Sequence, residues 1–97
     1  MNKQDVISRI KDYISSNGGS YSEWYIGIAS SPRERLFNDH NVNEKIDAWI
    51  YQQAESENEA REIEKFFLDN LRTDGGSGGG INPDYVYAYL KNNHTDP

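Results

Sequence analysis

The chain has 97 residues, a length that suits one domain with a modest hydrophobic core. Its lack of cysteine excludes disulfides, zinc–thiolate sites and thiol chemistry, and no apolar run approaches the ~20 residues of a membrane span. The net charge of -6 opposes a broad nucleic-acid-binding surface, since phosphate contacts normally come from basic residues. Because the N-terminus is polar and unlike a signal peptide, we expect a soluble, cytoplasmic protein without a membrane partner.

The first half of the sequence predicts two helices with a strand between them. Apolar residues recur at helical spacing over residues 3–16, and Asn17-Gly18-Gly19 ends that helix. Residues 23–29 alternate between bulky and small side chains, as strand residues do. A capping box at Ser31-Pro32-Arg33-Glu34, with proline at the first helical position, starts a helix over residues 32–39.

The second half predicts, in order, a strand, a helix, a glycine-rich flexible loop, a strand and a frayed tail. These cover residues 47–54, 57–71, 74–80, 84–90 and 91–97. A second capping box, from Ser56 to Glu59, starts the helix. We therefore expect a single α/β (α+β) domain spanning residues 1–97, with a small three-stranded sheet flanked by three helices.

Glu64 is a candidate functional carboxylate on its position alone. It lies inside an apolar stripe of the helix 57–71, whose other members are Ala60, Ile63, Phe67 and Leu71. A carboxylate on a core-facing stripe costs several kcal/mol unless it is paired, hydrogen-bonded or metal-bound. Glu64 is therefore expected to hold a hard cation such as Mg²⁺, to pair with Arg35 or Arg33, or to reach water at the helix edge.

Two arginines and a histidine lie on or just after the helix 32–39. The guanidinium fork of Arg35 suits a phosphate, and its alternative is a surface ion pair with Asp39 one turn later. Arg33 shares a helical face with Leu36 and His40, so it is expected to point toward the core side. His40 is a candidate C-terminal cap or general base.

Several of these residues recur at the spacing of a known signature. The Tyr25-Ile26-Gly27 strand is followed, eight residues after its glycine, by Arg35. Glu64 stands in an E-x-x-x-L context, and Asn82 follows Gly80 in a Gly-x-Asn setting. Over residues 24–82 the chain resembles the GIY-YIG nuclease superfamily, as a divergent member in which the opening Gly-Ile-Tyr strand is not found.

The resemblance implies a metal-dependent endonuclease that hydrolyses phosphodiester bonds of nucleic acids. It gives Glu64 the role of holding Mg²⁺ or Mn²⁺, and Arg35 that of neutralising the phosphate, with Arg33 as a further substrate contact. Asn82 would anchor the site, although its place before Pro83 is equally typical of an ordinary turn.

The resemblance also assigns a tyrosine to orient and help deprotonate the attacking water, with His40 assisting Tyr25. His40 follows Arg35 by five residues, whereas the family histidine commonly follows by four. Because the first motif is missing, we hypothesise that the strand 84–90 takes its place beside Tyr25. The tyrosines it would bring are Tyr85, Tyr87 and Tyr89, which are otherwise ordinary half-buried strand residues.

The alternative function is a catalytically inactive module of the same fold that binds a protein partner. The acidic charge, the missing first motif and the many tyrosine and tryptophan residues favour it, because aromatic residues are common anchors of protein interfaces. A basic cleft around Arg33 and Arg35 would favour the nuclease, and an acidic cleft would favour the protein-binding module.

Overall fold

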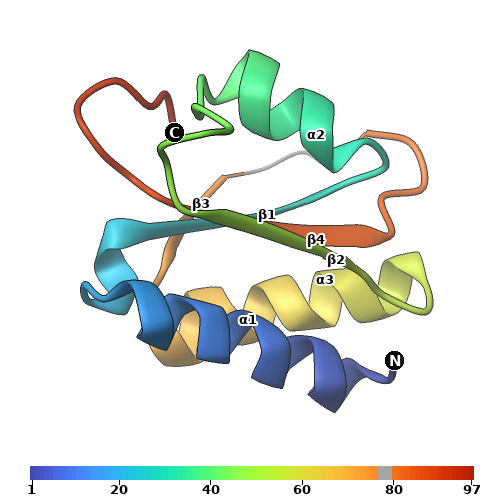
Figure 1. Cartoon of the computed structure of the whole chain (residues 1–97). Helices are drawn as coiled ribbons and strands as arrows, with labels where there is room; N and C mark the ends of the chain where they lie inside the picture. Colours follow the sequence, from blue (N-terminus) through green and yellow to red (C-terminus); the bar gives the residue numbers. More distant parts are fainter. Residues whose placement is uncertain (77–79) are drawn as a thin grey trace.

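Helices cover both sides of a mixed β-sheet in the computed structural model, which describes residues 1–76 and 80–97 (Figure 1). The elements are α1 (Lys3–Asn17), β1 (Trp24–Ala29), α2 (Pro32–Glu34), β2 (Trp49–Gln53), α3 (Glu57–Phe66), β3 (Asp74–Gly75) and β4 (Tyr85–Leu90). A 3₁₀ turn over Tyr21–Glu23 leads into β1. Turns of π-helix continue α2 over Arg35–Asp39 and α3 over Phe67–Leu71. No helix in these ranges is long and apolar enough to cross a membrane.

The sheet has the strand order β2-β4-β1-β3, so the last strand of the chain lies between two earlier ones. β4 is antiparallel to both neighbours, and Tyr87 stands opposite Gly27 on one side and Tyr51 on the other. The expected sheet of three strands is therefore corrected to four, because Asp74 and Gly75 form a short strand parallel to β1. Asp74 and Gly75 therefore belong to the sheet and not to the flexible loop that was expected over residues 74–80. The centre of that loop, Ser77 to Gly79, lies outside the described residues.

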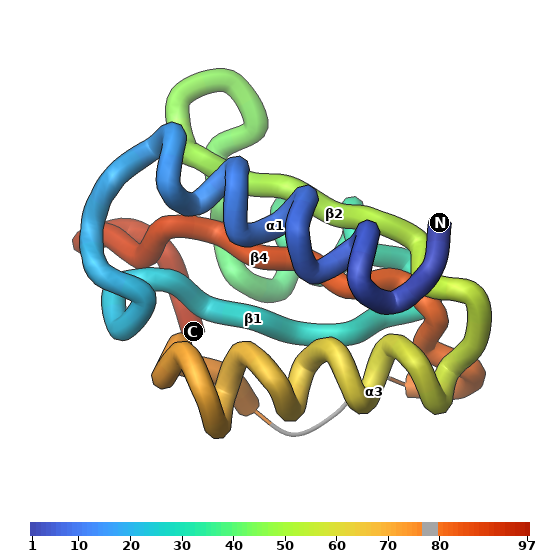
Figure 2. The backbone as a smooth tube through the Cα atoms, turned by 90° about the horizontal axis from the view of Figure 1, so that it is seen from below, coloured from blue at the N-terminus to red at the C-terminus, as the bar shows by residue number. Residues whose placement is uncertain are grey.

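One face of the sheet carries an aliphatic core beneath α1 and α3. In Figure 2 α1 crosses the sheet on the side of β2 and β4, while α3 runs beside β1. The core joins one stripe of each helix to alternate residues of β1 and β4: Val6, Ile7, Ile10, Ile14, Trp24, Ile26, Ile28, Ala54, Ala60, Ile63, Phe67, Val86 and Ala88. Burial of this apolar area is the main stabilising term of the fold.

The opposite face is covered by α2 and its π-helical turn. Here the cluster consists of Tyr25, Ala29, Leu36, Val42, Tyr87 and Tyr89. The alternation of β1 and β4 therefore sends aliphatic side chains to one face and tyrosines to the other. All three tyrosine rings carry a hydroxyl into the protein, where it needs a hydrogen-bond partner.

The helix starts agree only in part with the predicted capping boxes. Ser56 accepts a hydrogen bond from the Glu59 backbone N–H at 3.1 Å and caps α3 as expected. Ser31 makes no capping bond, because its ψ of 82° departs from the extended backbone that directs an N-cap oxygen at the first turn. Pro32 at the first helical position, with its fixed φ, starts α2 instead.

The last seven residues, expected to be a frayed tail, are held against the body of the protein. The Asp96 N–H donates to the His40 carbonyl at 2.7 Å, and the side-chain amide of Asn41 donates to the His94 carbonyl at 2.9 Å. The His94 imidazole lies 2.6 Å from a carboxylate oxygen of Asp47, whose side chain is only 6% exposed. These contacts join residues more than forty positions apart, so local sequence could not indicate them.

Candidate functional site

The π-helical turn after α2 brings Arg35 and His40 onto the tyrosine face of the sheet. The His40 N–H donates to the carbonyl of Arg35, five residues back, at 2.9 Å. In an α-helix that carbonyl would accept from the residue four positions later. The π-helical turn accommodates one extra residue, so His40 occupies the position that the fourth residue after Arg35 would have in an α-helix. Turns of this kind occur frequently at functional sites.

Both nitrogens of the His40 ring have partners, and these partners decide where its proton sits. Nδ1 lies 2.7 Å from the Asp96 carbonyl oxygen, which can only accept, so Nδ1 carries the hydrogen. Nε2 is then unprotonated and accepts from the Tyr87 hydroxyl at 2.7 Å. The Tyr89 hydroxyl lies 3.1 Å from Nδ1 and shares its hydrogen. His40 is thus both held by the C-terminal tail and available as a proton acceptor for Tyr87.

The electrostatic surroundings keep the His40 ring neutral. Burial is the main cause of its lowered pKa; the hydrogen bond to the Asp96 backbone opposes this, and the nearby Arg35 guanidinium lowers the pKa further. Burial also raises the pKa of Tyr25, Tyr87 and Tyr89, so their hydroxyls are protonated at neutral pH. The group able to take a proton in this cluster is therefore His40, and the groups able to donate one are the tyrosines.

Tyr25, Tyr87 and Tyr89 form one stack of rings on the sheet. The ring of Tyr25 lies 5.2 Å from that of Tyr89 and 6.3 Å from that of Tyr87. Gly27 makes this possible, because a Cβ there would lie 2.4 Å from Cζ of Tyr87. The last strand does lie beside β1, and Tyr87 and Tyr89, rather than Tyr25, hydrogen-bond to His40. Tyr25 packs against the imidazole, with the ring centres 4.6 Å apart.

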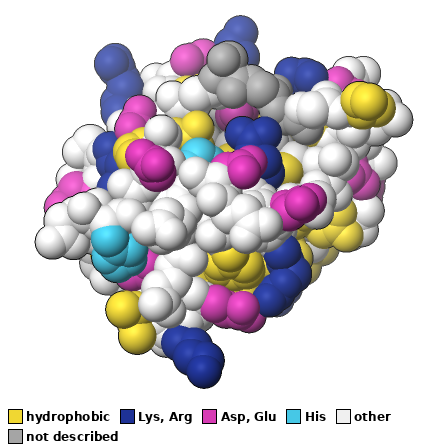
Figure 3. Space-filling view, turned by 90° about the horizontal axis from the view of Figure 1, so that it is seen from above, with side chains coloured by type: hydrophobic (Ala, Val, Ile, Leu, Met, Phe, Trp, Pro, Cys, Tyr) yellow, Lys and Arg dark blue, Asp and Glu magenta, His cyan; other side chains and the backbone are white. Residues whose placement is uncertain are grey.

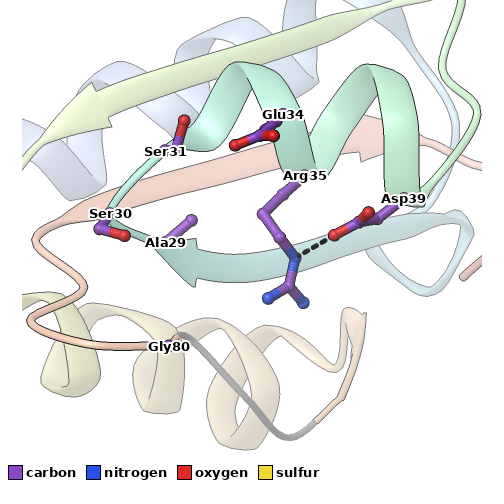
Figure 4. Close-up of a pocket in the computed structure, with 7 residues that line it drawn as sticks. All are labelled: Ala29, Ser30, Ser31, Glu34, Arg35, Asp39 and Gly80. Atoms are coloured by element: carbon purple, nitrogen blue, oxygen red, sulfur yellow. Dashed lines mark ion pairs between the residues drawn. The ribbon is translucent and has the colours of Figure 1, made fainter.

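Arg35 stands between two cavities and lines both. One, of about 510 Å³, is also bordered by Tyr25, His40 and Asp74. The other, of about 270 Å³, lies at the end of β1 and is bordered by Ser30, Ser31, Glu34, Asp39 and Gly80 (Figure 4). The Arg35 side chain points into the space between β1 and Gly80, with Nε 3.2 Å from a carboxylate oxygen of Asp39. Arg35 thus forms the expected ion pair with Asp39, and its guanidinium group still points into the smaller cavity (Figure 4).

Glu64 is half-buried on α3, at the edge of β1. Burial raises its pKa, and Arg61 on the same helix partly opposes this. Neither arginine expected as its partner forms an ion pair with it, because Arg33 pairs with Glu44 and Arg35 with Asp39. Its negative charge raises the pKa of both Tyr25 and Tyr87, although Glu64 lines neither of the cavities that Arg35 borders.

Asp74 is a second carboxylate at this site, which sequence reasoning missed. It borders the larger cavity, raises the pKa of Tyr25 and pairs with Lys91 at 3.1 Å. Gly76 lies against the Tyr25 hydroxyl, where a Cβ would approach its oxygen to 2.7 Å. The glycine-rich composition of residues 74–80 was the available signal, since glycine permits such a close approach.

Two of the expected site residues, Arg33 and Asn82, line neither of the cavities that Arg35 borders. Arg33 does not point toward the core: its side chain is 52% exposed and its Nη2 lies 2.6 Å from the Glu44 carboxylate. The reason is that Phe37 and Trp49 offer their ring faces to its guanidinium at the surface. Asn82 is exposed and has a φ of 51°, a left-handed conformation typical of a turn residue.

The charges around the site are mixed, and they form neither a basic nor an acidic cleft. Arg35 shares the smaller cavity with Glu34 and Asp39, and the larger one with Asp74. The space-filling view of the α2 side shows acidic and basic side chains interspersed over this face (Figure 3). Among the described residues, no three His, Cys, Asp or Glu side chains gather as ligands for a metal ion.

Comparisons of the chain with protein-family models, with curated proteins and with solved structures found no match.

Proposed function

We propose that this protein is a divergent GIY-YIG-like endonuclease that hydrolyses nucleic-acid phosphodiester bonds at the cavity between Tyr25, Arg35 and His40. The observation that carries the proposal is the hydrogen bond from the Tyr87 hydroxyl to Nε2 of a neutral, buried His40, beside a guanidinium that points into a cavity. A proton acceptor, hydroxyl donors and a fixed positive charge are the groups that hydrolysis of a phosphodiester needs.

Two features support the family assignment beyond the sequence motifs. β4 lies beside the Tyr-Ile-Gly strand β1, so it can take the part of the missing Gly-Ile-Tyr strand, with Tyr87 opposite Gly27. His40 follows Arg35 by five residues, whereas the family histidine commonly follows by four. The π-helical turn compensates for this extra residue, because its hydrogen bond spans five positions instead of four. The motif would then be present in space with its strands in a different order along the chain.

In the proposed reaction each residue has one role. The Tyr25 hydroxyl orients a water for attack on phosphorus, and His40 accepts the proton that passes through the Tyr87 hydroxyl. Arg35 donates hydrogen bonds to the phosphoryl oxygens, whose negative charge grows in the transition state. As the new P–O bond forms, the bond to the leaving oxygen breaks, and that oxygen takes up a proton from solvent.

In this proposal Glu64 is the carboxylate that holds a single Mg²⁺ or Mn²⁺. Glu64 is half-buried, has a raised pKa and lacks an ion pair with either expected arginine, so a cation would relieve its desolvation. Mg²⁺ is commonly bound through one or two carboxylates, with water and substrate phosphate as its other ligands. Bound there, the metal would stabilise negative charge on the scissile phosphate.

The test is a cleavage assay on single-stranded and plasmid substrates with Mg²⁺ or Mn²⁺, repeated with EDTA. We expect metal-dependent cutting that Glu64→Gln and Arg35→Lys each reduce at least about 100-fold, the loss typical when one group that stabilises the transition state is removed. The matched control is Glu62→Gln, which removes an exposed carboxylate of the same helix and should leave the rate unchanged.

Equal cutting by the wild type and Glu64→Gln would reject this site as its source. If no substrate is cut and Mg²⁺ leaves the melting temperature of the protein unchanged, the nuclease proposal fails. The catalytically inactive, protein-binding module then becomes the better account of the fold.

A further inference from the structure

A third cavity lies on the same face of the sheet, on the other side of the Ser30–Ser31 turn from Arg35. It is bordered by Tyr51 of β2 and Tyr85 of β4, and by Pro32 and Arg33 at the start of α2. The rings of Tyr51 and Tyr85 are 5.9 Å apart and nearly perpendicular, at 74°. Trp49 extends this aromatic surface, because its ring stacks on Tyr51 with an angle of 16° between the planes.

The dimensions and chemistry of this cavity suit one flat aromatic group. Its volume is about 210 Å³, below the roughly 300 Å³ at which pockets for drug-sized ligands begin. Tyr51 and Tyr85 are only half-buried, so ring surface remains for a further stacked group. The Arg33 guanidinium stands at the rim, held by Glu44 and by the rings of Phe37 and Trp49.

The three cavities on this face are neighbours, since adjacent ones share lining residues. Ser30 and Ser31 line both the aromatic cavity and the smaller cavity of Arg35. Arg35 in turn lines both that cavity and the one bordered by Tyr25 and His40. An extended chain could therefore follow one path from Tyr51 to His40, past two arginines.

We propose that Tyr51 and Tyr85 form a base-stacking subsite for single-stranded nucleic acid, which seats one nucleobase near the phosphate that Arg35 contacts. The inference rests on the proposed nuclease function for the position of that phosphate. A duplex buries the faces of its bases in its own stack, whereas a single strand presents them to aromatic side chains. Stacking is also the kind of binding open to this protein, because its net charge of -6 repels a polyanion, and Arg33 and Arg35 are the only lysine or arginine side chains that border the path in the described part of the chain.

This subsite gives binding an unusual salt dependence. Single-strand binding falls with salt at a slope of about −0.7 per phosphate contact in log affinity against log concentration. Two arginine contacts predict a slope of roughly −1.4, far shallower than that of proteins with basic binding surfaces. Affinity should therefore depend more on the tyrosine rings than on ionic strength.

The experiment measures binding of fluorescein-labelled oligothymidylate and oligouridylate by fluorescence anisotropy. EDTA is present throughout, so that no cleavage occurs. Tyr51→Leu and Tyr85→Leu should each weaken binding by about 5-fold to 100-fold, the loss expected for one stacked base. Tyr51→Phe keeps the ring and should bind as the wild type does. Tyr21→Leu changes a tyrosine on the opposite, aliphatic face and should have no effect on binding.

The possible failures of this inference and of the nuclease proposal are distinguishable. Equal binding by the wild type and Tyr51→Leu, with both shown to be folded by thermal melting, would overturn the stacking subsite even if the protein cleaves nucleic acid. Equal affinity for a duplex of the same length, a slope steeper than about −2, or no binding at all would also overturn it. Stacking-dependent binding without metal-dependent cleavage would support the subsite and refute the nuclease.

Discussion

The two faces of the sheet differ in what the alternating side chains of β1 and β4 present to the layer that covers them. Toward α1 and α3 the strands send aliphatic and tryptophan side chains, which pack against apolar residues of both helices. Toward α2 they send Tyr25, Tyr87 and Tyr89: the hydroxyls of Tyr87 and Tyr89 hydrogen-bond to His40, and the ring of Tyr25 packs against it. The same backbone alternation thus separates the part that stabilises the protein from the part that can do chemistry.

The comparison also shows how each face tolerates change. Aliphatic side chains stabilise the fold through the volume that they bury. The stability lost when one of them is shortened therefore increases with the size of the cavity left behind. The tyrosine face depends on hydrogen bonds in fixed directions and on the glycine beneath Tyr87, so small changes there should act on specific groups.

The largest expected effect is on the aliphatic face. Ile63→Ala should lower the free energy of unfolding by about 2–5 kcal/mol, because Ile63 is fully buried beneath the sheet. Urea denaturation followed by circular dichroism measures it. Ile46→Ala, the same change at a side chain that is 75% exposed, is the control and should stay within about 0.5 kcal/mol of the wild type. Similar losses at both positions would contradict the burial of Ile63.

A smaller effect is expected where the two faces share a strand. Gly27→Ala should cost about 1–3 kcal/mol, because the new methyl group would overlap the end of the Tyr87 ring. Tyr87→Leu removes the ring atoms that meet it. The double variant should therefore lose less stability than the sum of the two single variants, as a double-mutant cycle would measure. Strict additivity would mean that Tyr87 does not lie over Gly27.

The smallest expected effect is a dependence of stability on pH. It should arise from the tyrosine face, because the buried histidine, His40, lies there. The folded state lowers the pKa of His40, so the unfolded chain binds more protons as pH falls through its ordinary value of about 6.5. Stability is then fully present above that pH and declines below it. Unfolding measured between about pH 7.5 and 5.5 should show this decline in the wild type and a weaker one in His40→Asn. The decline should persist in His94→Asn. If that variant lost the decline, the protonation of His94, and not that of His40, would be its cause.

The elements of regular periodicity were predictable from sequence, and those without a side-chain signal were not. The strands at β1, β2 and β4 and the three helices follow from apolar spacing, within a few residues at each end. β3 consists of Asp74 and Gly75, residues typical of turns, and pairs only because β1 offers a free edge. The tail after β4 is polar, and its order depends on distant partners such as Asp47.

The site shows the same division. The neighbourhood of Tyr25 and the last strand was anticipated only through the resemblance, in which that strand takes the place of a missing one, and β4 does pair with β1. The direct bond between Tyr87 and His40 could not, because it depends on the π-helical turn that shifts His40 by one position. Arg33 was predicted to face the core on a regular helical wheel, and the aromatic rings at the surface hold it outside instead.

The position of β4 has a consequence for how the chain is made. Among the described residues β2 pairs only with β4, and β1 has just a two-residue pairing besides β4, so this sheet cannot form until residues 85–90 have been synthesised. While the ribosome is still adding them, β1 and β2 are unpaired strands whose backbone groups can join other chains. Folding must then close long loops in a single late step, which is slow for a protein of this size. Until β4 is in place, the backbone edges of β1 and β2 are therefore the parts of the sheet most open to pairing with other chains.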